Sequence, residues 1–116
     1  MRLQDGETFL EMASGRLEGG TSWVRADLVL QLEPSEPLAW AESLELLVRQ
    51  GYGAETFRSY SGQFQTTFAM AKKDELHISF LLQDAPDFLH ELRLFFNLPQ
   101  SELPRIIGEL RKVFAA

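Results

Sequence analysis

The chain of 116 residues contains no cysteine and only two histidines, which excludes several kinds of site at the outset. Without cysteine there is neither a disulfide framework nor a thiolate metal site. No segment approaches the ~20 apolar residues that a membrane-spanning helix needs. The opening residues, MRLQDGETF, also lack the apolar region of a secretory signal. These absences predict a cytoplasmic protein that does not enter a membrane.

Sequence motifs that carry metal, nucleotide or acyl-transfer chemistry are also missing. His77 and His90 do not lie in the HExxH frame that presents two imidazoles to zinc. No serine lies in a G-x-S-x-G stretch, and the glycines at Gly51 and Gly53 are not followed by the lysine of a phosphate-binding loop. The sequence therefore predicts no metal, no cofactor and no catalytic residue.

One group of carboxylates keeps an enzyme open as an alternative. Asp84, Asp87 and Glu91 lie close in sequence and could supply a carboxylate pair or an oxygen-ligand site. Their spacing is not that of a calcium-binding loop, and no acid–base partner accompanies them. We therefore interpret them as loop and capping residues and predict that the protein is not an enzyme.

The net charge of −6 is concentrated in the first half of the chain. Residues 1–57 hold ten acids against four arginines, whereas acids and bases cancel in residues 58–116. Such a surface either keeps the protein in solution or docks a basic partner. Nucleic-acid binding would need a basic patch, which the chain lacks. One run in the first half has no base at all and contains five acids: Asp27, Glu33, Glu36, Glu42 and Glu45.

Hydrophobic periodicity near the C-terminus predicts a strand followed by a helix. Every second residue from Leu92 to Leu98 is apolar, which is typical of a strand with one buried face. A helix over residues 88–98 is the alternative, because several of the same side chains also recur at helical spacing. Beyond Pro99 a second pattern, with the spacing of an amphipathic helix, consists of Leu103, Ile106, Ile107, Leu110 and Phe114.

The rest of the chain completes one α+β domain over residues 1–116. Strands are predicted within 7–17, 23–32, 55–60, 63–71 and 75–83 from alternating apolar residues. Gly15, Gly19 and Gly20 are expected to interrupt the structure after the first strand. The Lys72-Lys73-Asp74 turn joins the strands within 63–71 and 75–83 as a hairpin. A helix beginning near Pro37 has an apolar stripe of Trp40, Leu44, Leu47 and Val48. The predicted fold is an antiparallel sheet of four to six strands packed against this internal helix and the C-terminal helix.

Aromatic residues outside the predicted core suggest where a partner could bind. Trp40 fits the buried stripe of the first helix, whereas Trp23 heads a predicted strand and Tyr52 and Tyr60 bracket a turn region. Partly exposed tryptophan and tyrosine are common anchors of protein interfaces, although each one alone is more often ordinary packing. Together with the acidic run they define the predicted partner-binding set: Trp23, Asp27, Glu33, Glu36, Glu42, Glu45, Tyr52 and Tyr60.

The order of these features resembles the WapI-type immunity family and related small bacterial families of unknown function. The likeness rests on a tryptophan-containing strand, an amphipathic helix, the strand ELHISF and the closing segment ELRLFFNLPQSELPRIIGELRKVF, and it covers about residues 22–114. It implies a non-enzymatic protein that binds and neutralises a cognate toxin, and it transfers no functional residue.

The sequence thus leads to two functional hypotheses. The first is a small acidic protein-binding module, with an immunity protein for a basic toxin as its specific form. Carboxylates of residues 27–45 would pair with the partner's lysines and arginines. The alternative is a homodimeric adaptor or chaperone-like subunit that associates through an open sheet edge or an uncovered face.

Overall fold

A computed structural model describes residues 1–13, 15–33, 35–70, 74–84 and 90–113 of the chain. These residues form two antiparallel four-stranded sheets and two α-helices. Each sheet is a meander in which every strand pairs with the next along the chain. Sheet A consists of β1 (Arg2–Asp5), β2 (Thr8–Ala13), β3 (Arg16–Gly20) and β4 (Arg25–Val29). After α1 (Ser35–Gln50) come the strands of sheet B and the last helix: β5 (Gly53–Arg58), β6 (Phe64–Met70), β7 (Glu75–Gln83), β8 (Glu91–Pro99), a short 3-10 turn (Gln100–Glu102) and α2 (Leu103–Val113).

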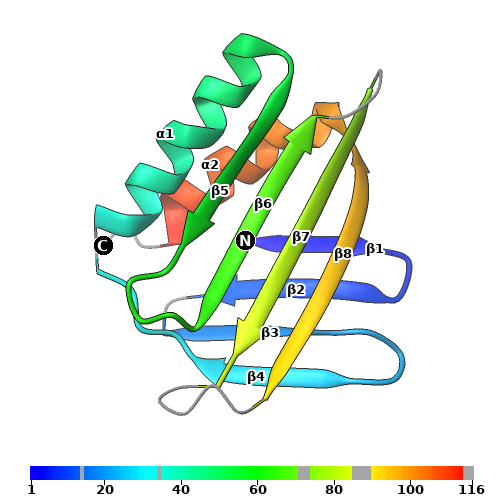
Figure 1. The fold of residues 1–116 in the computed structure, drawn as a ribbon, viewed down its shortest axis with the longest axis vertical. Coiled ribbons are helices and arrows are strands. Elements are labelled where there is room, and N and C mark those ends of the chain that lie inside the picture. The colour runs from blue at the N-terminus through cyan, green and yellow to red at the C-terminus, as the bar shows by residue number, and fades with distance from the viewer. Residues whose placement is uncertain (14, 34, 71–73, 85–89, 114–116) are drawn as a thin grey trace.

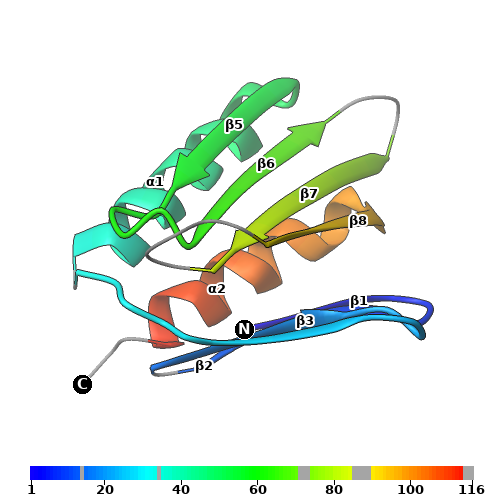
Figure 2. The same ribbon diagram turned by 60° about the horizontal axis from the view of Figure 1, so that its bottom comes forward.

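The two sheets are stacked with their strands crossing steeply, as Figure 1 shows. In the rotated view, sheet A forms a separate layer below sheet B, and both helices lie on the same side of sheet B as sheet A (Figure 2). One face of sheet B is therefore shared between α1, α2 and sheet A, while its other face is turned away from the rest of the molecule.

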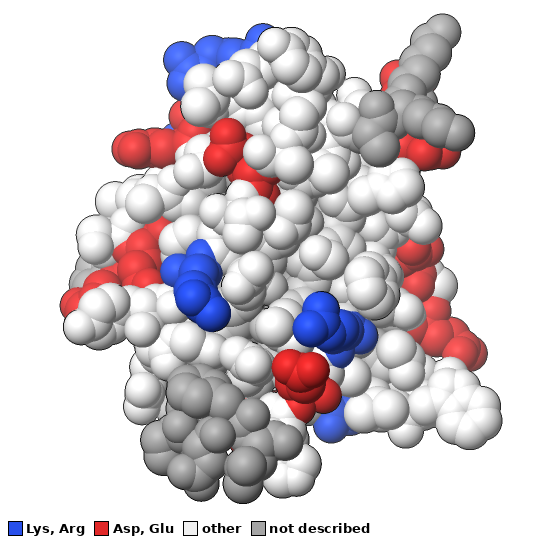
Figure 3. All heavy atoms as spheres, viewed as in Figure 1, with Lys and Arg blue, Asp and Glu red and all other residues white. Residues whose placement is uncertain are grey.

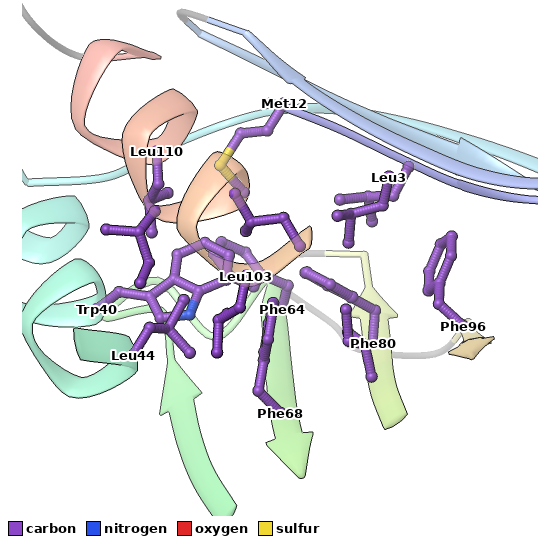
Figure 4. Packing of buried hydrophobic residues seen from close by; sticks show 14 of the residues in the cluster. Leu3, Met12, Trp40, Leu44, Phe64, Phe68, Phe80, Phe96, Leu103 and Leu110 are labelled. Atoms are coloured by element: carbon purple, nitrogen blue, oxygen red, sulfur yellow. The ribbon is translucent and has the colours of Figure 1, made fainter. Parts of the chain in front are cut away.

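A single apolar core joins the two sheets and the two α-helices (Figure 4). Trp40 of α1 lies at its centre, stacked on Phe57 at 5.1 Å between ring centroids and within 6.1 Å of Phe80. Sheet A contributes Leu3 and Met12 to the same cluster. Aromatic pairs at these separations stabilise a core beyond the burial of their area. Because one cluster includes side chains from both sheets, neither sheet has a core of its own.

The α+β antiparallel fold predicted from the sequence is confirmed, with the strands divided between two sheets. Residues 91–99 form strand β8 and not a helix; residues 85–89, where the alternative helix would begin, lie outside the described residues. The alternation in the 63–71 and 75–83 segments also predicted the correct faces, since Phe68 and Ile78 are buried. The lysines of the predicted turn, Lys72 and Lys73, are not among the described residues.

Glycines 19 and 20 do not interrupt the structure, contrary to the expectation from sequence. Both lie within β3, where small residues are required by close packing. A Cβ on Gly19 would lie 2.8 Å from Leu94 Cδ1 of sheet B, and one on Gly20 would lie 2.3 Å from the carbonyl oxygen of Val24. Glycine here permits the sheets to approach and the chain to turn, so its usual reading as a strand breaker was wrong.

The helices bury most of their predicted stripes. In α1, Trp40, Leu44 and Leu47 are buried, but Val48 is 41% exposed because it borders a groove between the two helices. The predicted residues of α2 are buried except Phe114, which lies outside the described residues. Neither described helix is long and apolar enough to cross a membrane.

Candidate protein-binding surfaces

The eight residues predicted to bind a partner do not form one surface. Asp27 lies on β4, Glu33 precedes α1, and the other three acids lie on α1. The three aromatics are exposed in three different connections, which Figure 1 shows at separate corners: Trp23 between β3 and β4, Tyr52 between α1 and β5, and Tyr60 between β5 and β6. Residues 27–45 are close in sequence, but in the structure they are distributed over the edge strand β4, the connection that follows it and α1.

Asp27 is already paired within the protein. Arg16 on the neighbouring strand donates two hydrogen bonds to its carboxylate, one of them from Nε at 2.9 Å. These bonds lower the pKa of Asp27 below its ordinary value and raise the pKa of Arg16. The pair lies on the outer face of sheet A, where it is one of three arginine–carboxylate pairs. Asp27 therefore has less charge available for a partner than its position in the sequence suggested.

Glu45 is also neutralised internally. Its carboxylate accepts a hydrogen bond from Arg111 of α2. This contact joins the two helices across the groove bordered by Val48. By contrast, the exposed carboxylate of Glu42 has no ion pair with any described residue.

Three residues of the set, Glu33, Glu36 and Tyr60, do converge, in a hollow of about 350 Å³ that we call the Tyr60 hollow. Its lining consists of Gln31, Leu32, Glu33, Glu36, Tyr60 and Ser61. Glu36, in the first turn of α1, accepts the backbone N–H of Glu33 at 2.7 Å and also that of Tyr60. A carboxylate is favoured at this end of a helix by the helix dipole. Glu36 thus fastens the β5–β6 connection to the start of α1, and the side chain of Glu33 stays exposed.

The connection that carries Tyr60 is held by buried hydrogen bonds. Ser59 is buried; its hydroxyl accepts the N–H of Phe64 at 3.1 Å and donates to the carbonyl of the same residue at 3.2 Å. Gly62, at φ +79°, donates its N–H to the Ser59 carbonyl at 3.0 Å. The ring of Tyr60, 88% exposed, is therefore presented on a fixed loop. Sequence reasoning found Tyr60 but not the serine that positions it.

Gln63 is the second residue that sequence reasoning missed. Gln63 is 6% exposed. Its side-chain amide makes hydrogen bonds to the backbone of residues 29–31, at the end of β4, in the pattern of a neighbouring strand. Nε2 donates to the Val29 carbonyl at 2.6 Å, and Oε1 accepts the N–H of Gln31 at 2.9 Å. Because both amide groups are satisfied, the buried glutamine costs little and ties the two sheets together. A lone glutamine before a strand carries no sequence signal for this role.

The outward side of sheet B is a second candidate surface, which we call the open face. Strand register places its middle row as Thr56, Thr67, Ser79 and Phe95 across the four strands. Phe95 is 67% exposed in this row. Figure 3 looks onto this side of the molecule and shows few charged side chains across its middle. The other outward residues are Ala54, Arg58, Gln65, Ala69, Glu75, His77, Leu81, Gln83, Glu91, Arg93, Asn97 and Pro99.

The carboxylates considered for an enzyme are only partly described. Asp84 accepts the backbone N–H of His90 at 2.9 Å and lies 2.9 Å from its Nδ1. These contacts, the backbone bond first, lower the pKa of Asp84. Asp84 and Glu91 border a small hollow of about 200 Å³ beside β4, while Asp87 lies outside the described residues. Within the described ranges, no three histidine, aspartate or glutamate side chains are grouped to hold a metal ion.

Neither the protein-family models nor the curated proteins with which the chain was compared gave a match. The resemblance to the WapI-type immunity family therefore stays a prediction from the sequence.

Proposed function

We propose that this protein is a non-catalytic binding module that recognises a basic protein partner at the Tyr60 hollow. An immunity protein that neutralises a basic toxin by occlusion, in the cytoplasm, is the form of this function that the family resemblance favours. One observation carries the proposal. Glu33, Glu36 and Tyr60, three residues of the predicted set, line the same hollow, whereas Asp27 and Glu45 are paired with arginines of the chain itself.

The hollow suits a lysine or arginine side chain of the partner. The carboxylate of Glu33 has no ion pair with a described residue and can accept charge-assisted hydrogen bonds. The exposed ring of Tyr60 offers its face to the same cation. Since Glu36 and Ser59 already hold the loop, binding needs little further ordering of the chain, which favours affinity.

The overall charge supports the same assignment. A net charge of −6 attracts a basic partner from a distance and makes the association rate dependent on salt. An occluding protein needs only to cover the basic surface around the toxin's site, so it requires no catalytic group of its own.

If a secreted protein with a basic C-terminal domain is encoded beside this gene, the test is calorimetry of this chain with that domain, and the absence of such a neighbour would count against the toxin as partner. We expect the wild-type chain to bind, and Glu33→Lys to weaken the affinity by about tenfold or more by placing like charges together. Tyr60→Ala should cost a similar factor, because exposed aromatics in a fixed position are typical binding hot spots.

Glu42→Lys is the matched control. It makes the same change of charge near Glu33 in sequence, at an exposed position outside the hollow. We expect it to reduce affinity by less than about threefold, through weaker steering alone. Equal losses of affinity in Glu33→Lys and Glu42→Lys would show that binding depends on overall charge, and would contradict the Tyr60 hollow as the binding site. Absence of binding by the wild-type chain would contradict the function itself.

A further inference from the structure

The open face of sheet B differs in chemistry from the rest of the exterior, and we propose that a second copy of this chain docks on it as a two-fold symmetric dimer. The middle row of the face consists of small hydroxyl residues and ends, on the edge strand β8, in an aromatic side chain. Phe95 is 67% exposed, and the hydroxyls of Thr56 and Thr67 lie 2.9 Å apart and bond to each other. The two paired threonine hydroxyls lose little on leaving water, so burying Phe95 in this row is favourable.

Charge selects a second copy as the occupant. The chain carries −6, so contact between two copies generally brings acids together. On the open face, Arg58 and Arg93 balance Glu75 and Glu91, and the middle row has no charge. Two copies can therefore meet here without net repulsion. A strongly basic partner would gain nothing from this face, in contrast to the Tyr60 hollow.

The outer face of sheet A also has balanced charges, but it is unsuited to contact with a second copy. Its charges lie in the middle of the face, as the pairs Arg16–Asp27, Arg25–Glu18 and Arg2–Glu11. Bringing such pairs into an interface core requires their desolvation, which their mutual attraction only partly offsets. Interface cores are accordingly depleted of charged residues.

The dimensions of the open face predict a weak dimer. Four strands of six to nine residues each, about 4.8 Å apart, give a face of roughly 20 by 25 Å. About 500 Å² per copy lies below the roughly 800 Å² of a standard interface, so association should depend on concentration in the micromolar range. A two-fold axis crossing the strands at the middle row places the two Phe95 rings near each other. It sets the row of Arg58 and Arg93 against the row of Ala54 and Asn97 in the other copy, which holds no acid or arginine.

Sedimentation equilibrium of the full chain from about 5 to about 500 µM tests the proposal over the range expected for such an interface. The apparent mass of the wild-type chain should rise from one chain to two. Phe95→Asp should raise the dissociation constant by at least about 100-fold, because it sets two carboxylates against each other near the axis. If Phe95→Asp does not fold, Thr67→Lys, in the middle of the same face, replaces it in the test, and we expect the same effect on the dissociation constant.

Val29→Asp provides the matched control. Val29 is likewise an exposed apolar residue on a strand, 73% accessible, but it lies on the outer face of sheet A. This variant should dimerise as the wild type does. Salt between about 0.05 and 0.5 M should change dimerisation little, since the contact is uncharged at its centre. A wild-type mass of one chain at every concentration would overturn the proposal, as would dimerisation that survives both Phe95→Asp and Thr67→Lys or is lost equally in Val29→Asp.

Discussion

The outer faces of the two sheets are built on the same alternation but have opposite surface chemistry. On sheet A, three arginines are paired with Glu11, Glu18 and Asp27 on adjacent strands. On sheet B, the middle row holds three hydroxyl residues and Phe95. The first face satisfies its own charges, and the second leaves an apolar group without a partner.

The two outward phenylalanines show the difference most directly. Phe9 on sheet A is covered by two guanidinium groups, with Arg2 at 5.4 Å and Arg25 at 5.7 Å from its ring centroid. Phe95 on sheet B is covered by no arginine or lysine among the described residues and is 67% exposed. A strand position that faces solvent thus becomes an inert surface or an available one according to its cross-strand neighbours. The comparison teaches that binding surfaces are better sought from register than from the residue type alone.

The inner faces, unlike the outer ones, should act as a unit. Leu17 of sheet A is fully buried in the core shared with sheet B. Leu17→Ala should therefore cost about 2–5 kcal/mol of unfolding free energy and shift the unfolding of the whole chain. The measurement is urea unfolding followed by the fluorescence of Trp40, in a Trp23→Phe background that removes the exposed tryptophan.

Val29→Ala is the control for this variant, because Val29 lies on the outer side of the adjacent strand β4 and is exposed. It should change stability by less than about 0.5 kcal/mol. If Leu17→Ala produces two separate transitions, with the Trp40 signal unchanged, the sheets fold independently and the shared core is wrong as an account of the stability of the molecule.

A smaller effect is expected from the link between the sheets. Gln63→Ala leaves the Val29 carbonyl and the Gln31 N–H without their side-chain partner, so it should cost about 1–3 kcal/mol. Gln65→Ala, two residues later on the open face, removes the same side chain where no hydrogen bond to it is made within the described residues, and should cost less than about 0.5 kcal/mol. Similar unfolding midpoints in urea for the two variants would show that the bridge contributes nothing to stability.

The fold could be predicted from sequence where the pattern was local. Alternation identified β6, β7 and β8 with their buried faces, and helical spacing identified α1 and α2. What sequence could not supply was the division into two sheets, because it depends on the packing of Leu94 over Gly19, residues 75 positions apart in the chain. A glycine that admits a neighbouring side chain has the same sequence signal as one that ends a strand.

The candidate site was predictable only in part, for a similar reason. The sequence suggested that Trp23, Tyr52 and Tyr60 could be partly exposed, although ordinary packing was the commoner expectation for each one alone, and all three are exposed. Charge availability did not, because pairing depends on distant residues: Arg111 reaches Glu45 from another helix. Gln63 was missed because its role depends on where the end of sheet A passes it.

The smallest expected effect concerns the charge pairs of sheet A and is seen only in acid. Hydrogen bonds from Arg16 hold the pKa of Asp27 below its ordinary value, so the carboxylate stabilises the folded chain above the ordinary aspartate pKa. That contribution is lost as the pH falls through the lowered folded-state pKa. Asp27→Asn should therefore lose less stability than the wild type between pH 7 and about pH 2.5, measured by thermal unfolding midpoints. Glu42→Gln, which removes a carboxylate outside any described ion pair, should follow the wild-type profile. An Asp27→Asn profile parallel to that of the wild type would mean that the ordered pairs on sheet A are no more than solvated charges, and the contrast between the two outer faces would then rest on Phe9 and Phe95 alone.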